Sequence, residues 1–168
     1  MTDRQQGFSI IEIMTVMVII GILAAIAIPL MHGYQVRAKN TQAVSDVYHL
    51  LLFENQFYDE NHEYVSIAPS DKQANGLISK NVTLADGSSA LFEIRTLTAG
   101  VQIAVNTDAG NQTIVIGGIT AGSSDIIALD PDAADGYHII PLSGSFSASS
   151  LPNATTGKDL SAYPLYQQ

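Results

Sequence analysis

The stretch that decides the fold runs from Ile13 to Met31 and reads Ile-Met-Thr-Val-Met-Val-Ile-Ile-Gly-Ile-Leu-Ala-Ala-Ile-Ala-Ile-Pro-Leu-Met. Its 19 residues carry no charge. A helix of roughly 20 apolar residues crosses a hydrocarbon core of ~30 Å. The run follows a short polar segment, residues 1–7, and contains no convincing small-residue cleavage site before a polar mature start. An uncleaved anchor, or a leader that is removed ahead of the run, therefore explains it better than a conventional secretory signal.

Glu12 stands at the start of this run and separates the remaining interpretations. An acidic residue at the centre of a membrane helix costs ~2.5–3.5 kcal/mol, and near the helix start the dipole offsets part of that cost. A plain anchor gains nothing from such a residue, and intramembrane carboxylates normally have a partner. Cleavage between Gly7 and Phe8 would create a positive α-amino group close to Glu12. The carboxylate therefore favours a cut ahead of the apolar run.

The N-terminal motif resembles that of bacterial type IV pilins and the related pseudopilins. The resemblance rests on Gly7-Phe8-Ser9-Ile10-Ile11-Glu12 followed by Gly21-Ile22-Leu23-Ala24-Ala25-Ile26-Ala27-Ile28-Pro29. It covers about residues 7–31 and continues more loosely as far as Tyr64. It implies that a prepilin peptidase cuts after Gly7 and N-methylates Phe8. It also implies that the chain then leaves the inner membrane and stacks into a helical fibre.

The resemblance further implies the partners and the location of the chain. In the fibre, the carboxylate of Glu12 would neutralise the Phe8 amine of a neighbouring copy. The partners would be further copies of the chain, the prepilin peptidase, the inner-membrane assembly machinery and, before assembly, the membrane itself. Nucleic acid would be bound only through the assembled fibre. The chain would begin as a single-pass inner-membrane precursor and end in an extracellular pilus, or in a periplasmic filament if it is a pseudopilin.

The helical pattern continues beyond the apolar run. Apolar residues recur every three or four positions at Ala43, Val44, Val47, Tyr48, Leu50, Leu51, Phe57 and Tyr58, with Leu52 and Phe53 widening the stripe. The charged and polar residues expected on the other face or its margins are Arg37, Lys39, Gln42, Asp46 and Glu54. Residues 8–60 are thus predicted to form one helix of ~80 Å. Its first half is apolar all round and has to be covered by lipid or by other copies.

Four segments are predicted from these boundaries. Residues 1–7 are a leader, 8–31 the membrane-spanning or assembly half of the helix, 32–60 its amphipathic half, and 61–168 a globular β domain with loops. Gly21 and Pro29 lie in the apolar half, where a proline removes a backbone donor and clashes with the preceding turn. We expect a kink at Gly21 and Pro29 that lets the helix unwind locally inside a fibre.

The globular part is predicted to be an antiparallel sheet. Residues 61–90 contain turn signals and are expected to form a loop. Alternating apolar residues then predict four short strands at 91–97, 101–107, 112–117 and 124–129, with a fifth run at 137–140 as an edge strand. Short connections favour an antiparallel meander whose apolar face packs on the helix. The fold class is therefore α+β, a long helix packed on a sheet of about four strands.

The C-terminal region has no cysteine that could hold it in place. Tyr163, Leu165 and Tyr166 are expected to pin the end of the chain to the sheet. Four acidic residues before Gly136 are weak calcium candidates, since Ca²⁺ prefers oxygen ligands: Asp125, Asp130, Asp132 and Asp135. Their spacing does not fit an EF-hand, so a solvated acidic turn is the expected structure and no cofactor is required.

The composition and motifs argue against an enzyme. The 168 residues carry 7 basic and 16 acidic side chains, a net charge of −9, which opposes a nucleic-acid-binding surface. The four histidines are scattered, and the sequence contains no Gly-rich phosphate loop, GxSxG or HExxH motif. No catalytic residue is predicted.

The sequence thus predicts a structural subunit, the major pilin of a type IV pilus, with adhesion, motility or DNA uptake as the outcomes that the family implies. A pseudopilin of a type II secretion system is the first alternative. A membrane-anchored periplasmic enzyme or binding module is the second, and it leaves Glu12 unexplained.

Overall fold

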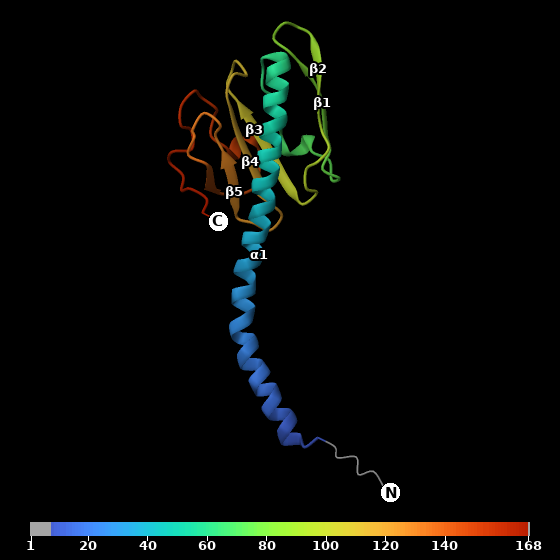
Figure 1. The fold of residues 1–168 in the computed structure, drawn as a ribbon, viewed down its shortest axis with the longest axis vertical. Coiled ribbons are helices and arrows are strands. Elements are labelled where there is room, and N and C mark those ends of the chain that lie inside the picture. The colour runs from blue at the N-terminus through green and yellow to red at the C-terminus, as the bar shows by residue number, and fades with distance from the viewer. Residues whose placement is uncertain (1–7, 168) are drawn as a thin grey trace. The chain divides into compact units, whose positions relative to one another are not determined.

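A computed structural model describes residues 8–167 of the chain (Figure 1). It contains one long helix, α1 (Ile10–Asn61), which is followed by two short 3-10 helices and six strands. These are η1 (Pro69–Asp71), β1 (Ile78–Thr83), β2 (Ser89–Ile94), β3 (Val101–Thr107), β4 (Ile114–Thr120), β5 (Asp125–Leu129), β6 (Tyr137–Pro141) and η2 (Ala148–Ser150). The chain divides into two units between Arg37 and Ala38, and α1 contributes to both.

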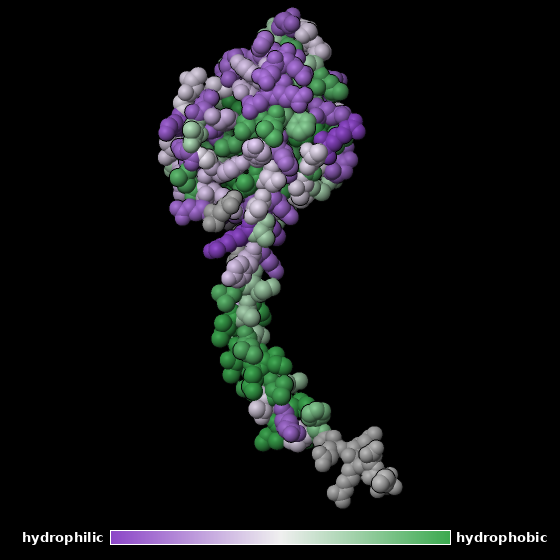
Figure 2. Space-filling view, in the orientation of Figure 1, coloured by the Kyte–Doolittle hydropathy of each residue, from purple (hydrophilic) through white to green (hydrophobic). Residues whose placement is uncertain are grey.

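The first unit is helical and apolar. α1 runs without interruption through Pro29, and the stretch from Ile10 to Met31 is long and apolar enough to cross a membrane. Its large apolar side chains are exposed, from 47% at Ile13 to 81% at Ile10. Figure 2 shows this stretch as a nearly unbroken hydrophobic surface. The predicted long helix is confirmed, whereas the kink at Gly21 and Pro29 stays a prediction.

The second unit is built around a four-stranded antiparallel sheet with the order β3-β4-β5-β6. Both edges of this sheet are covered by chain segments. Ile67 pairs with Val105 at the β3 edge, through N–H···O bonds of 3.1 and 2.9 Å. At the β6 edge the Ile139 amide donates to the Pro164 carbonyl oxygen, and the Tyr166 amide donates to that of Tyr137. Covered edges remove the exposed backbone that would otherwise pair with other chains.

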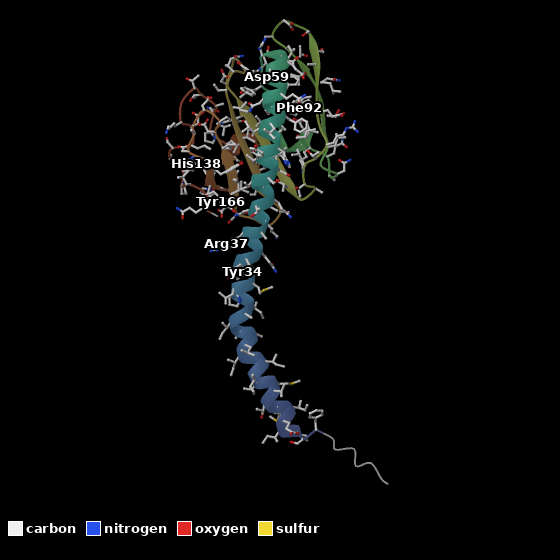
Figure 3. All side chains as sticks on the ribbon, viewed as in Figure 1. Tyr34, Arg37, Asp59, Phe92, His138 and Tyr166 are labelled. Atoms are coloured by element: carbon white, nitrogen blue, oxygen red, sulfur yellow. The ribbon has the colours of Figure 1, made fainter. Side chains whose placement is uncertain are left out.

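The sheet has an apolar core on each face. On one face, Ala43, Val47, Leu50 and Phe57 of α1 are buried against the sheet, as their spacing predicted. Phe92 of β2 joins this core, with its ring centroid 5.5 Å from that of Phe57 (Figure 3). The opposite face is covered by the C-terminal segment, whose buried residues are Leu151, Ala154 and Leu160. β4 lies between these two layers, and all seven of its residues are buried.

Gly117 and Gly118 in β4 explain how both layers come so close to the sheet. A Cβ atom at Gly118 would lie 2.9 Å from Val47 Cγ2 and 3.5 Å from the Ala43 carbonyl oxygen. A Cβ at Gly117 would collide with the Leu151 side chain. The glycine pair looks like a turn signal in the sequence, but here it serves the close approach of α1 on one face and of the tail on the other.

Gly118→Val is therefore expected to destabilise the second unit by roughly 1–3 kcal/mol or more, because overpacking forces α1 away from the sheet. Near-ultraviolet circular dichroism of the tyrosines during thermal unfolding of the detergent-solubilised chain would measure the effect. Gly100→Val is a matched control, since a Cβ there meets nothing within 4 Å. Equal melting temperatures for the two variants would contradict the packing argument.

The strand prediction needs three corrections. Residues 78–83, predicted to be loop, form β1, which pairs with β2 in a separate two-stranded hairpin. The predicted strand 91–97 is thus part of that hairpin rather than of the four-stranded sheet. The strand predicted at 112–117 is displaced to 114–120, whereas the edge strand predicted at 137–140 is confirmed as β6. The hairpin was missed because β1 reads Ile-Ser-Lys-Asn-Val-Thr, with only Ile78 fully buried.

Asp46 and Glu54 also lie elsewhere than predicted. They were expected on the polar face of the helix or at its margins, yet they are only 1% and 0% exposed. Asp46 accepts hydrogen bonds from the Thr98 amide (2.8 Å) and hydroxyl (2.9 Å). Glu54 Oε2 accepts one from the Val65 amide at 2.9 Å. Asp46 and one oxygen of Glu54 thus accept backbone amide hydrogens from loops, which offsets part of the cost of burying these groups.

Candidate assembly and processing segment

The functional residues that the sequence singles out lie at the start of α1. Gly7 lies outside the described residues, so the structure begins directly after the predicted cleavage site. Phe8 is 85% exposed and precedes the helix, and Ile10 is its first residue. Phe8 and Glu12 are therefore four residues apart at the helix start, and local sequence alone sets that spacing.

Ser9 and Glu12 bind each other at the helix start. The Ser9 amide donates to Glu12 Oε2 at 2.8 Å. The Glu12 amide lies 3.1 Å from the Ser9 carbonyl oxygen and 3.5 Å from Ser9 Oγ. This is the capping-box arrangement, in which the N-cap serine and a glutamate three residues later satisfy each other's amides. Sequence reasoning assigned no role to Ser9, although the Ser-x-x-Glu spacing carries the signal.

The rest of the segment presents almost nothing polar. The Thr15 hydroxyl donates to the Ile11 carbonyl oxygen at 2.8 Å, so it is satisfied within the helix. The exposed apolar residues include Met17, Ile20, Leu23 and Ile28, each at 58% or more. A helix that is apolar all round needs lipid or other protein around it. The Glu12 carboxylate thus lies at the N-terminal end of an apolar helix surface that needs lipid or other protein around it.

Comparison with known proteins places this segment in a family. Residues 2–28 match the prokaryotic N-terminal methylation motif. A fimbrial protein of Pseudomonas aeruginosa is 37% identical over 121 residues, which are 71% of this chain and 73% of that protein. This chain belongs to the type IV pilin family. No solved structure matches this pilin well enough to be compared with it.

Two further relatives of this pilin are similar over a shorter stretch. The type II secretion system core protein G of Escherichia coli is 41% identical over 63 residues, 38% of this chain and 43% of that protein. The type IV major pilin protein PilA of Myxococcus xanthus is 42% identical over 65 residues, 39% of this chain and 30% of that protein. These two relatives thus resemble this pilin over little more than a third of its length, whereas the Pseudomonas aeruginosa fimbrial protein does so over 71%.

The acidic loop of this pilin does not gather its carboxylates around one point. Asp130 is buried and accepts hydrogen bonds from the amides of Asp132 (3.0 Å) and Asp159 (2.8 Å). Asp135 faces His138 and Lys158, whereas Asp125 lies at the start of β5. Burial, Asp130 and Asp159 raise the pKa of the Asp132 carboxyl. No group of three or more metal-binding side chains is arranged around a metal position within residues 8–167. The expected solvated turn is therefore wrong for the buried Asp130, and the four aspartates stay weak calcium candidates.

The C-terminal tail is held to the sheet without a disulfide. The Tyr163 carbonyl oxygen lies 2.9 Å from His138 Nδ1, which must donate because a carbonyl only accepts. Asn106 Nδ2 donates to the carbonyl oxygens of Leu151 (3.2 Å) and Pro152 (3.0 Å). Figure 3 shows His138 and Tyr166 in the C-terminal half of the second unit. The predicted docking of Tyr163, Leu165 and Tyr166 is confirmed: the two tyrosines pack against the cores, and Leu165 pairs with His138 at the β6 edge although its side chain is 49% exposed.

Proposed function

We propose that this pilin is the major structural subunit of a type IV pilus. Its apolar helix first anchors the chain in the inner membrane and then forms the core of an extracellular filament. The observation that carries the proposal is the length of the similarity to the Pseudomonas aeruginosa fimbrial protein. It spans 121 residues and so extends beyond the N-terminal helix into the globular unit. Adhesion, motility or DNA uptake would be functions of the filament rather than of the single chain.

The physical basis is that the same apolar helix surface can be buried in two environments, first in the lipid bilayer and then in the filament. The exposed side chains from Ile10 to Met31 are covered by acyl chains before assembly and by the same segment of other copies afterwards. The second unit folds around its own two-sided core, so it does not depend on that exchange. Such a chain acts by assembling, and we propose no catalytic role for it.

A pseudopilin of a type II secretion system is the second candidate. It is favoured by the 41% identity to core protein G of Escherichia coli. That similarity covers 63 residues, about half the length shared with the fimbrial protein. Shearing filaments from cells and measuring their length separates the two. Micrometre-long extracellular fibres built mainly of this chain support the pilus, and their absence in cells that secrete through this chain supports the pseudopilus.

Processing provides an independent prediction. A prepilin peptidase is expected to cut between Gly7 and Phe8 and to add one methyl group to the Phe8 nitrogen, which keeps its positive charge. Mass spectrometry of the mature chain should therefore show an N-methylated Phe8 start. Substitution of Gly7 should leave the full-length precursor in the membrane. A mature chain that begins at Met1, or after Ala25, would refute this assignment.

A further inference from the structure

The two oxygens of the Glu12 carboxylate are in different situations. Oε2 accepts the Ser9 amide hydrogen at 2.8 Å. Oε1 makes no hydrogen bond to any residue between 8 and 167. A carboxylate has about four acceptor positions, so binding the Ser9 amide leaves most of its capacity unused. One oxygen is thus committed to the chain's own backbone, and the other is available.

The capping contact also determines where the carboxylate is held. Ser9 follows Phe8 directly, and consecutive backbone nitrogens lie about 3–4 Å apart. Glu12 Oε2 is therefore within roughly 7 Å of the nitrogen that cleavage turns into the N-terminal amine. The contact to the Ser9 amide survives that cleavage, because it involves no atom before Phe8. The box therefore keeps the negative charge at the very end of the mature helix.

The surroundings make this contact more important than in a soluble helix. The first four amides of any helix lack partners within the helix. In hydrocarbon no water can replace them, and an unsatisfied amide there is costly. The box satisfies the Ser9 amide with the carboxylate, and it gives the Glu12 amide two acceptors on Ser9. A freely rotating Glu12 side chain would leave the Ser9 amide without an acceptor and would not hold the negative charge in one place.

We propose that Ser9 is a positioning residue for assembly: its capping box with Glu12 holds Oε2 on the chain's own backbone and presents Oε1 to the amine of another copy. The inference rests on the proposed filament function. Assembly then adds a partner to a carboxylate that is already oriented. Ser9 and Glu12 act as one unit, in which Ser9 sets the geometry and Glu12 supplies the charge.

The contact is tested first in the monomer, independently of any fibre. The full-length mature chain, labelled with ¹⁵N and ¹³C and held in detergent micelles, is titrated with acid while the Ser9 amide proton is followed by NMR. The Ser9 amide resonance is expected to move together with the Glu12 side-chain carboxyl carbon. In Glu12→Ala the pH-dependent movement should be lost. A Ser9 amide that does not respond while the carboxyl carbon titrates overturns the proposal.

The positioning role is tested by a pair of variants with the same shape. Ser9→Thr retains a side-chain oxygen, whereas Ser9→Val cannot accept from the Glu12 amide. Ser9→Thr should form fibres like wild type, and Ser9→Val should form roughly fivefold fewer, which matches the usual cost of losing an N-cap oxygen. Equal fibre yields from the two variants overturn the role of the Ser9 side chain.

Glu12→Gln tests the negative charge of Glu12 separately from the capping box. Glutamine can take the place of glutamate in a capping box, so the helix should still start at Ile10. Without the charge it should not pair with an amine, and fibre yield should fall as strongly as in Glu12→Ala. If Glu12→Gln assembles normally, the carboxylate is not presented to an amine and the proposal fails. If wild type itself makes no fibres, the proposed function fails, while the NMR titration still decides whether the box exists.

Discussion

Glu12→Ala is expected to abolish fibres, or to reduce them strongly, while the protein still inserts into the membrane and folds. Insertion becomes easier when an acidic residue is removed from an apolar segment. In a fibre core made of Ile, Val and Met, by contrast, the Phe8 amine of each copy needs a negative partner. Stripping an ion of water costs several kcal/mol, which only a close opposite charge repays. Wrong axial staggers would leave both charges unpaired, so we expect the pair to fix the register of the copies.

Counting sheared fibres by electron microscopy measures the effect. The amount of mature chain in the membrane fraction shows that expression and insertion are unchanged. Thr15→Val is a suitable control, because the Thr15 hydroxyl donates to the Ile11 carbonyl oxygen of its own helix and binds no other residue among those described. It should leave fibres intact. When co-expressed with wild type, the Glu12→Ala chain should be poorly incorporated. Fibres of normal number and length from the variant alone would show that Glu12 does not set the register.

Glu54→Gln is expected to stabilise the second unit at neutral and alkaline pH. Glu54 is fully buried, Oε2 binds the Val65 amide, and Oε1 has no hydrogen-bond partner among residues 8–167. Burial raises the pKa of the Glu54 carboxyl from 4.5 to about 8, and the Val65 amide and the Lys80 charge offset only part of that effect. Glutamine keeps an oxygen for Val65 and carries no charge at any pH, so it avoids the cost of burying a carboxylate.

The direction of the pH dependence follows from linkage. Between the ordinary pKa and the raised one, the folded protein holds a proton on Glu54 that the unfolded chain has lost. The stabilisation is therefore complete at low pH and is lost as the pH rises through about 8. Over that range the free energy of unfolding of the wild type should fall relative to Glu54→Gln by as much as ~5 kcal/mol.

Thermal unfolding of both chains in detergent, measured from acidic to mildly alkaline pH, gives this difference directly. Subtracting the free energy of unfolding of the variant from that of the wild type at each pH removes the contributions of other groups that titrate in the same range. Glu60→Gln is the control, since Glu60 is an exposed residue on the same helix that accepts a hydrogen bond from Gln56 Nε2 at 3.4 Å. Parallel stability curves for wild type and Glu54→Gln would contradict the burial of an ionisable Glu54.

The first part of this protein is determined almost completely by local sequence. Whether residues 10–31 can span a membrane depends on a long run of apolar side chains that carries no charge after Glu12, and this run is visible without a fold. The same holds for Glu12, whose capping partner Ser9 is three residues away. The stripe from Ala43 to Phe57 and the alternation in Val101–Thr107 also predicted their elements, because helix and strand periodicities are properties of neighbouring residues.

The tertiary structure alone decided which polar and glycine residues belong to the interior. Asp46 is buried because the Thr98 amide, 52 residues later, is brought to it, and Glu54 because Val65 turns back over the end of α1. Gly117 and Gly118 lie inside a strand because α1 and the C-terminal tail both pack against it. The β1–β2 hairpin forms because β1, which is only weakly apolar, pairs with β2 and packs in the same core as α1. A buried carboxylate or a close backbone contact depends on which distant donors and side chains meet it, and no periodicity within the sequence encodes that encounter.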